Sequence, residues 1–168
     1  HGKMRKYSYQ YHGTMATASG VKTFLRHILQ SNERAEAAGR KKNPVCIWGR
    51  HGIGKTELVQ QLVEAEKYAF AYIAPAQFEE MGDLIGMPAI ENDQTVFRQP
   101  SWVPTDEGPG ILLIDDVNRA DDRILRGIMQ LLQNFELVSW KLPPKWQIVL
   151  TANPDGGDYS VTPIDDAM

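Results

Sequence analysis

The sequence predicts an α/β fold, a three-layer α/β/α sandwich in which helices cover both faces of a mostly parallel β-sheet. Short apolar runs with the length of buried strands alternate along the chain with segments of helical periodicity, an order typical of parallel sheets. The runs are apolar without interruption, which indicates burial on both faces. The 168 residues, 42% of them hydrophobic and 23% charged, fit one ordinary globular domain. Ligands of such folds bind at the carboxyl ends of the strands.

The first half of the chain is expected to alternate helix and strand. A helix is expected over residues 20–38, where apolar side chains recur at helical spacing: Val21, Phe24, Leu25, Ile28 and Leu29. Gly39 and the Asn43-Pro44 dipeptide end this helix. The elements that follow are a buried strand over 45–48, a glycine-rich turn, a helix over 54–67 and a strand over 70–73.

The second half begins with an irregular stretch. Residues 75–109 contain five prolines, and one short helix is expected there, over 78–85. A third buried strand is expected over 111–114. The helix expected next begins with Asp121 and Asp122, whose carboxylates favour the helix dipole. The remaining expected elements are that helix over 121–135, a hairpin over 136–142, a fourth strand over 147–151, and over 153–168 a loop that leads into the start of a helix.

The composition and the ends of the chain bound its organisation. Residues 1–19 have no periodic pattern and are expected to be a tag remnant and a flexible arm, so residues 20–168 form the expected domain. The formal net charge of −3 gives no case for binding nucleic acid through bulk electrostatics. Cys46, the single cysteine, cannot form an intramolecular disulfide, which favours a cytoplasmic protein with a buried thiol. The apolar runs are too short to cross a membrane.

A phosphate-binding loop is predicted directly after the first strand. Residues 49–56 match the pattern G-x-x-x-x-G-K-[ST] between a strand and a helix. Glycines let successive backbone N–H groups turn toward phosphate oxygens, and the helix N-terminus adds its positive dipole end. Lys55 is expected to reach the β- and γ-phosphates, and Thr56 to ligate Mg²⁺. The predicted ATP-binding residues are Gly49, Arg50, His51, Gly52, Ile53, Gly54, Lys55, Thr56 and Glu57. The alternative is a glycine-rich turn with an incidental lysine.

Two acidic residues follow the third strand, at the edge where the phosphate loop is expected. Asp115 is predicted to hold Mg²⁺ beside Thr56, and Asp116 to orient the attacking water. Aspartate is one methylene shorter than glutamate, so its carboxylate sits roughly 1–1.5 Å further back. Misplacement of that size can cost on the order of 10²-fold in rate. The alternative is a pair of exposed aspartates that cap the next turn.

Asn153 ends the fourth strand and is predicted to contact the γ-phosphate or the attacking water. Its predicted place is between the strand of the phosphate loop and the strand of the acidic pair. The alternative is an ordinary Asn-Pro turn with Pro154. Lys55, Asp116 and Asn153 are therefore the predicted catalytic residues, and Thr56 and Asp115 the predicted metal ligands.

Taken in order, these motifs resemble AAA+ ATPases of the MoxR type, within the P-loop NTPase superfamily. The resemblance covers roughly residues 18–167 and rests on the following segments: Gly49–Thr56, Gly82–Pro88, Pro100–Pro104, Ile111–Ala120, Lys141–Pro143 and Ile148–Pro154. It implies that the loop binds ATP, that Asp115 and Thr56 hold magnesium, and that Asn153 is the sensor-1 residue. It also implies hexameric rings that remodel protein partners in a chaperone-like manner, often beside a protein with a von Willebrand factor A domain. The segments around 82–100 and 137–143 resemble insertions that such ATPases turn toward a pore or partner.

The sequence departs from this family pattern in two ways. Asp116 stands where the family usually has Glu. From Asn153 to Met168 there is no arginine or lysine, although AAA+ catalysis uses an arginine from the neighbouring subunit, a role worth about 10³–10⁵ in rate. We therefore expect a core that lacks its arginine finger, fifth strand and helical lid, and that hydrolyses little ATP alone. Arg119, Arg123 and Arg126 are expected to be exposed or to lie at a subunit contact.

The leading functional prediction is a Mg²⁺-dependent ATPase that remodels or assembles a protein partner. The first alternative is an ATP-dependent switch or scaffold with weak hydrolysis, which Asp116 and the missing arginine favour. A second alternative is a small-molecule phosphotransferase, which requires a lid rich in arginine that this sequence does not offer.

Overall fold

A computed structural model describes residues 18–49, 54–153 and 160–164. Its centre is a five-stranded sheet with the order β2-β5-β8-β1-β9. The strands are β2 (Ala69–Ile73), β5 (Gly110–Ile114), β8 (Trp146–Ala152), β1 (Val45–Trp48) and β9 (Ser160–Pro163). Neighbours among the first four are parallel, whereas β9 pairs with β1 in the antiparallel direction. The predicted mostly parallel sheet is confirmed.

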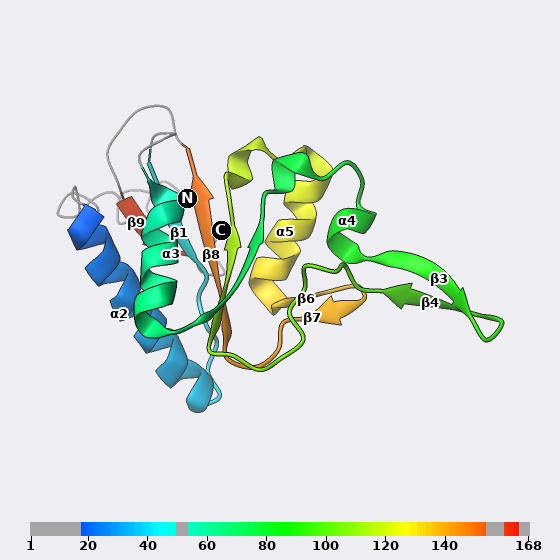
Figure 1. Cartoon of the computed structure of the whole chain (residues 1–168), viewed down its shortest axis with the longest axis horizontal. Coiled ribbons are helices and arrows are strands. Elements are labelled where there is room, and N and C mark those ends of the chain that lie inside the picture. The colour runs from blue at the N-terminus through cyan, green and yellow to red at the C-terminus, as the bar shows by residue number, and fades with distance from the viewer. Residues whose placement is uncertain (1–17, 50–53, 154–159, 165–168) are drawn as a thin grey trace.

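Helices cover both faces of this sheet (Figure 1). Helices α2 (Ala18–Ala37) and α3 (Lys55–Glu66) lie on one face, and α5 (Asp122–Asn134) lies on the other. Side chains of β5 alternate between the two layers: Ile111 and Leu113 join the core under α2 and α3, and Leu112 packs under α5. This alternation within an uninterrupted apolar run is the pattern of a strand buried on both faces. The α/β/α sandwich expected from the sequence is therefore confirmed.

The helix boundaries follow local sequence signals. Asp121 caps α5, because its carboxylate accepts a hydrogen bond from the Ile124 backbone N–H at 3.0 Å. Lys67 ends α3 with a left-handed backbone, φ 58°. Cys46 is buried in β1 as expected, and burial raises the pKa of its thiol.

Strand β9 corrects the prediction for the end of the chain. Residues 153–168 were expected to form a loop and the start of a helix, with no fifth strand. The structure instead pairs Val161 with Ile47 and buries its side chain against α2 and α3. Four residues are too few to show a period, and this strand depends on the exposed edge of β1, which lies more than 100 positions earlier in the sequence.

The irregular stretch also contains a hairpin that was not predicted. A 3₁₀ turn (Pro75–Gln77) and the short helix α4 (Gly82–Ile85) precede the strands β3 (Met87–Glu91) and β4 (Gln94–Arg98). Asn92 and Asp93 connect them with φ values of 52° and 64°, as in the two-residue hairpin turns that these residue types favour. The hairpin extends away from the sheet (Figure 1), and Ile90 is 80% exposed on it.

A second, shorter hairpin supports the base of the first. Strands β6 (Glu136–Leu137) and β7 (Trp140–Lys141) form the hairpin expected over 136–142. Its Trp140 indole N–H donates to the Leu84 carbonyl at 2.9 Å, and the Ser139 hydroxyl donates to the Ile85 carbonyl at 2.6 Å. From the other side, the Trp102 indole N–H donates to the Asp83 carbonyl at 2.9 Å. These donors satisfy carbonyl groups of α4 and so anchor the chain just before β3.

A short 3₁₀ turn, η2 (Val117–Arg119), follows β5 and contacts β8.

Within the described part of the chain, no helix combines the length and the apolar character that a membrane span requires.

Candidate functional site

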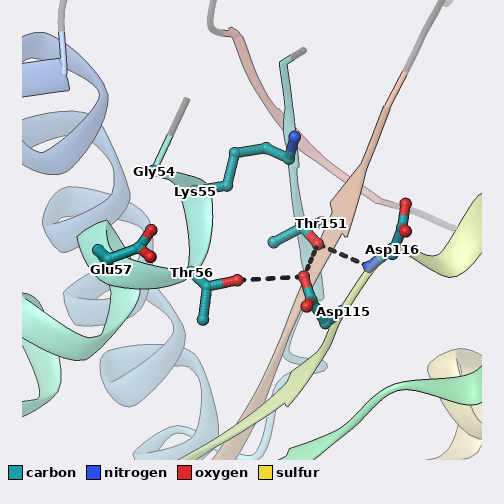
Figure 2. A pocket seen from close by; sticks show the side chains of 7 residues that line it. All are labelled: Gly54, Lys55, Thr56, Glu57, Asp115, Asp116 and Thr151. Carbon is teal, nitrogen blue, oxygen red and sulfur yellow. Dashed lines mark hydrogen bonds between the residues drawn. The ribbon is translucent and has the colours of Figure 1, made fainter. Parts of the chain in front are cut away.

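The candidate site is a cavity of about 300 Å³ at the carboxyl edge of the sheet. Figure 2 shows its walls: the start of α3 on one side and the ends of β5 and β8 on the other. The lining residues are Gly54, Lys55, Thr56, Glu57, Asp115, Asp116 and Thr151. All of these residues except Thr151 were predicted from the sequence as site residues. Folding therefore brings together sequence positions about 60 residues apart.

Gly54, in the predicted phosphate-binding loop, directly precedes α3. Gly54 has φ 87° and ψ 26°, a left-handed backbone that favours glycine. Its carbonyl accepts the first helical hydrogen bond, from the Leu58 N–H at 3.0 Å. The N-terminus of this twelve-residue helix therefore points its dipole into the cavity. The predicted loop residues Arg50, His51, Gly52 and Ile53 lie outside the described residues.

Lys55 extends over the cavity from the first turn of α3 (Figure 2). Its Nζ donates to the carbonyl of Gly49, at the end of β1, at 2.5 Å. The Gly49 N–H in turn donates to the Ala152 carbonyl at 3.2 Å, which ties the start of the loop to β8. Burial lowers the pKa of Lys55, and the negative charges of Asp116 and Asp115 oppose this effect.

Among the described residues, three hydroxyl groups donate hydrogen bonds to the carboxylate of Asp115. Thr151 Oγ1 lies 2.6 Å and Thr56 Oγ1 3.2 Å from Oδ1 of Asp115. The phenol of Tyr72, at the end of β2, lies 2.6 Å from Oδ2. Donors on α3, β8 and β2 therefore hold the carboxylate from three sides. Thr56 and Asp115, the two predicted metal ligands, lie beside each other.

Asp116 has a left-handed backbone, and both its N–H and its carboxylate have partners. Its φ of 56° and ψ of 48° lie in the left-handed region, which aspartate tolerates better than most residues. Its N–H donates to Thr151 Oγ1 at 2.7 Å. Its carboxylate pairs with Arg119, with Oδ2 3.2 Å from Nε, and points in a different direction from that of Asp115 (Figure 2).

Asn153 lies at the end of β8, one position beyond the strand. Asn118 holds its backbone twice: the Asn118 side-chain amide donates to the Asn153 carbonyl, and the Asn153 N–H donates to Asn118 Oδ1, both at 3.1 Å. Asn153 is not among the described residues that line the cavity. The structure thus places Asn153 beside Asn118, in the turn after the two aspartates. Thr151, two residues before Asn153, lies in the cavity wall.

Sequence reasoning missed the parts that Tyr72, Thr151 and Asn118 play. Each makes its contact with a residue 35 or more positions away. An aromatic residue or a threonine in a strand is expected to pack, so neither indicates a polar contact by type alone. The available signal was position, because Tyr72 and Thr151 stand at the carboxyl ends of strands that flank β5.

Tyr72 gives the site a pH-dependent contact. Burial, then the hydrogen bond to Asp115, and then the charges of Asp115 and Asp116 raise the pKa of Tyr72 to about 12, from an ordinary value of 10.0. A pKa raised by folding gives stability that is present below about pH 10 and lost as the pH rises through about 12. We expect the wild-type protein to lose more thermal stability than Tyr72→Phe between about pH 9 and about pH 11. Thermal unfolding followed by circular dichroism checks this, and equal losses would contradict the assignment.

Comparisons with known proteins identify a family and a relative. The family model "AAA domain (dynein-related subfamily)" matches residues 44–168. A Midasin from Giardia intestinalis is 32% identical over 136 residues, which cover 72% of this chain and 3% of that protein.

Two solved structures are also similar. A candidate ATPase from Cytophaga hutchinsonii has a TM-score of 0.48 at 16% identity. The match covers 89% of this chain and 49% of that chain. NtrX from Brucella abortus has a TM-score of 0.49 at 15% identity, with coverages of 78% and 30%. The chain therefore spans less than half the length of each of these proteins. On the family match, which covers most of its length, the chain belongs to the dynein-related subfamily of AAA domains, a family of P-loop ATPases.

Proposed function

We propose that the chain binds Mg²⁺-ATP in the cavity between α3 and the ends of β5 and β8, and hydrolyses it. The observation that carries this proposal is the meeting of the Thr56 hydroxyl and the Asp115 carboxylate, 3.2 Å apart, below the ammonium of Lys55. Two oxygen donors from different elements converge there, and hard cations such as Mg²⁺ prefer oxygen ligands. The donor set therefore fits magnesium.

The roles of the residues follow from their places around the cavity. The α3 N-terminus and Lys55 bind the phosphates, and Lys55 exchanges its bond to the Gly49 carbonyl for the phosphate oxygens. Thr56 and Asp115 hold the cation, which neutralises phosphate charge when bound. The loop from Gly49 to Glu57 forms the remainder of the ATP site. Asp116 orients the attacking water, and Asn153 contacts the γ-phosphate or that water.

The proposed cellular role is that of a MoxR-like, chaperone-type ATPase, whose core spans residues 20–168 and which remodels or assembles a protein partner. Support comes from the two hairpins beside α4, since Phe97 and Ile90 on one and Val138 on the other are exposed apolar side chains. The resemblance of the motifs supports a homo-hexameric ring and a partner with a von Willebrand factor A domain.

A second candidate function is an ATP-dependent switch or scaffold with weak hydrolysis. The observation that favours it is the pairing of the Asp116 carboxylate with Arg119. A carboxylate held by an arginine and built on a shorter side chain than glutamate is poorly placed to orient a water molecule. In this case ATP binding itself would change the partner contacts.

The Asp116→Glu variant separates the two functions. For a hydrolase, we expect turnover in the wild-type full-length gene product and a change of less than about 3-fold in Asp116→Glu, because Asp116 already supports the reaction. A gain on the order of 10²-fold in the variant would assign the switch instead, because the added methylene would restore the distance to the water. Steady-state phosphate release measures both proteins. Asp122→Glu is the matched control, since Asp122 is an exposed aspartate on the first turn of α5.

A further inference from the structure

The hydroxyl of Thr151 is a buried junction between the two acidic residues. Thr151 is 0% exposed in the centre of the sheet edge. Its Oγ1 donates to Asp115 Oδ1 at 2.6 Å and accepts from the Asp116 N–H at 2.7 Å. A threonine hydroxyl has one donor and two acceptor positions, so one group satisfies both neighbours at once (Figure 2).

The Thr151 hydroxyl takes the place of a backbone hydrogen bond just beyond the point where the pairing of β5 with β8 ends. The parallel pairing of β5 with β8 ends at Ile114 and Leu150. Beyond it the chain turns away through the left-handed Asp116 into η2, while β8 continues to Ala152. The Thr151 side chain accepts the N–H that the ladder no longer satisfies. Asn118 joins the same two segments again at Asn153.

The bond to Asp115 is shorter than the competing bond from Thr56. Both hydroxyls donate to the same carboxylate oxygen, Thr151 at 2.6 Å and Thr56 at 3.2 Å. When Thr56 turns toward a bound cation, Thr151 still holds Oδ1 and the Tyr72 phenol still holds Oδ2. The orientation of the Asp115 carboxylate therefore does not depend on Thr56.

We propose that Thr151 is a positioning residue, which sets the orientation of the Asp115 carboxylate and the backbone of Asp116 through one hydroxyl. The proposal rests on the function proposed above. It assigns Thr151 no contact with the phosphates. As a consequence, Asp115, which holds the cation, and Asp116, which orients the water, keep a constant relative geometry. A merely structural threonine would affect stability but not the contribution of Mg²⁺ to ATP binding.

The test compares Thr151→Val, which removes the hydroxyl at nearly constant shape, with Thr151→Ser, which retains it. ATP affinity is measured by titration calorimetry with Mg²⁺ and in EDTA, and the ratio of the two affinities is the readout. We expect this ratio to fall at least about 10-fold in Thr151→Val, because Asp115 is no longer held in one orientation. We expect Thr151→Ser to stay within about 3-fold of wild type. Thr95→Val, an exposed site on the β3–β4 hairpin, is the control for the substitution itself.

A second measurement does not require nucleotide. Hydrogen exchange of the Asp116 amide, followed by NMR, should be at least about 10-fold faster in Thr151→Val than in wild type and Thr151→Ser, because its acceptor is gone. An unchanged affinity ratio in Thr151→Val, or an equal fall in Thr151→Ser, would overturn the positioning role while the proposed function stands. A wild-type protein that binds no ATP would overturn the proposed function and this inference with it. A Thr151→Val protein that does not fold leaves the decision to Thr151→Ala, judged by the same two readouts.

Discussion

Replacing Lys55 with alanine is expected to weaken ATP binding on the order of 10²-fold. Lys55 extends over the cavity, and we expect the hydrogen bonds proposed between its ammonium and charged phosphate oxygens to contribute about 3 kcal/mol. Each 1.4 kcal/mol corresponds to about a tenfold change in affinity. The loss should be much smaller for adenosine, because adenosine carries no phosphate. Titration calorimetry with ATP and with adenosine measures both.

Lys141→Ala is the matched control for this charge change. Lys141 is an exposed lysine on strand β7, outside the cavity lining. We expect its ATP affinity to stay within about 2-fold of wild type, because exposed charges at a distance are screened by salt. Unchanged ATP binding in Lys55→Ala, or equal losses in the two variants, would contradict the assignment of residues 49–56 as the phosphate-binding loop.

The second large effect is expected for Asp115→Asn. This change keeps the shape of the side chain but removes the charge that faces the cation, and its amide offers one acceptor oxygen to three donating hydroxyls. Loss of one electrostatic contribution at a reacting phosphoryl group costs on the order of 10²–10³-fold in turnover. We expect a loss of this size in Mg²⁺-dependent turnover of the full-length gene product, and a smaller loss in ATP affinity measured in EDTA.

Thermal unfolding separates this loss from a loss of structure. Asp115→Asn leaves one of the hydroxyls of Thr56, Tyr72 and Thr151 without its acceptor, so we expect a lower unfolding temperature but a cooperative transition. Asp122→Asn, at an exposed aspartate of α5, controls for the substitution. A variant with wild-type turnover at saturating Mg²⁺ would show that Asp115 does not hold the cation.

The sequence predicted the parts of the fold that depend on local patterns. The apolar stripe of α2, the glycines before Lys55 and the uninterrupted apolar run of β5 each lie within about 20 residues of chain. Periodicity and turn chemistry act over such distances. The same reasoning failed for β9, whose strand conformation depends on the free edge of β1. The β3–β4 hairpin was missed although Asn92-Asp93 offered a local turn signal, because the surrounding prolines favoured an irregular stretch.

The candidate site divides in the same way. Lys55, Thr56, Asp115 and Asp116 were predicted from spacing, since the carboxyl ends of parallel strands meet at one edge of the sheet. The partners of the Asp115 carboxylate were not predicted. Nor were the pairing of Asp116 with Arg119 and the two bonds between Asn118 and Asn153. A hydroxyl or amide has many possible partners in a sequence, and only the folded chain selects among them.

By itself, then, the sequence determined the sandwich of helix and strand layers, and it predicted a phosphate-binding loop and the acidic residues opposite it. These features follow from short-range spacing and from the general rule for strand ends. The tertiary structure alone decided how the acidic residues are held. The register of β2, β5 and β8 brings Tyr72 and Thr151 beside Asp115. Strand register is set by packing across the whole sheet, and a shift of one residue would turn both hydroxyls to other faces.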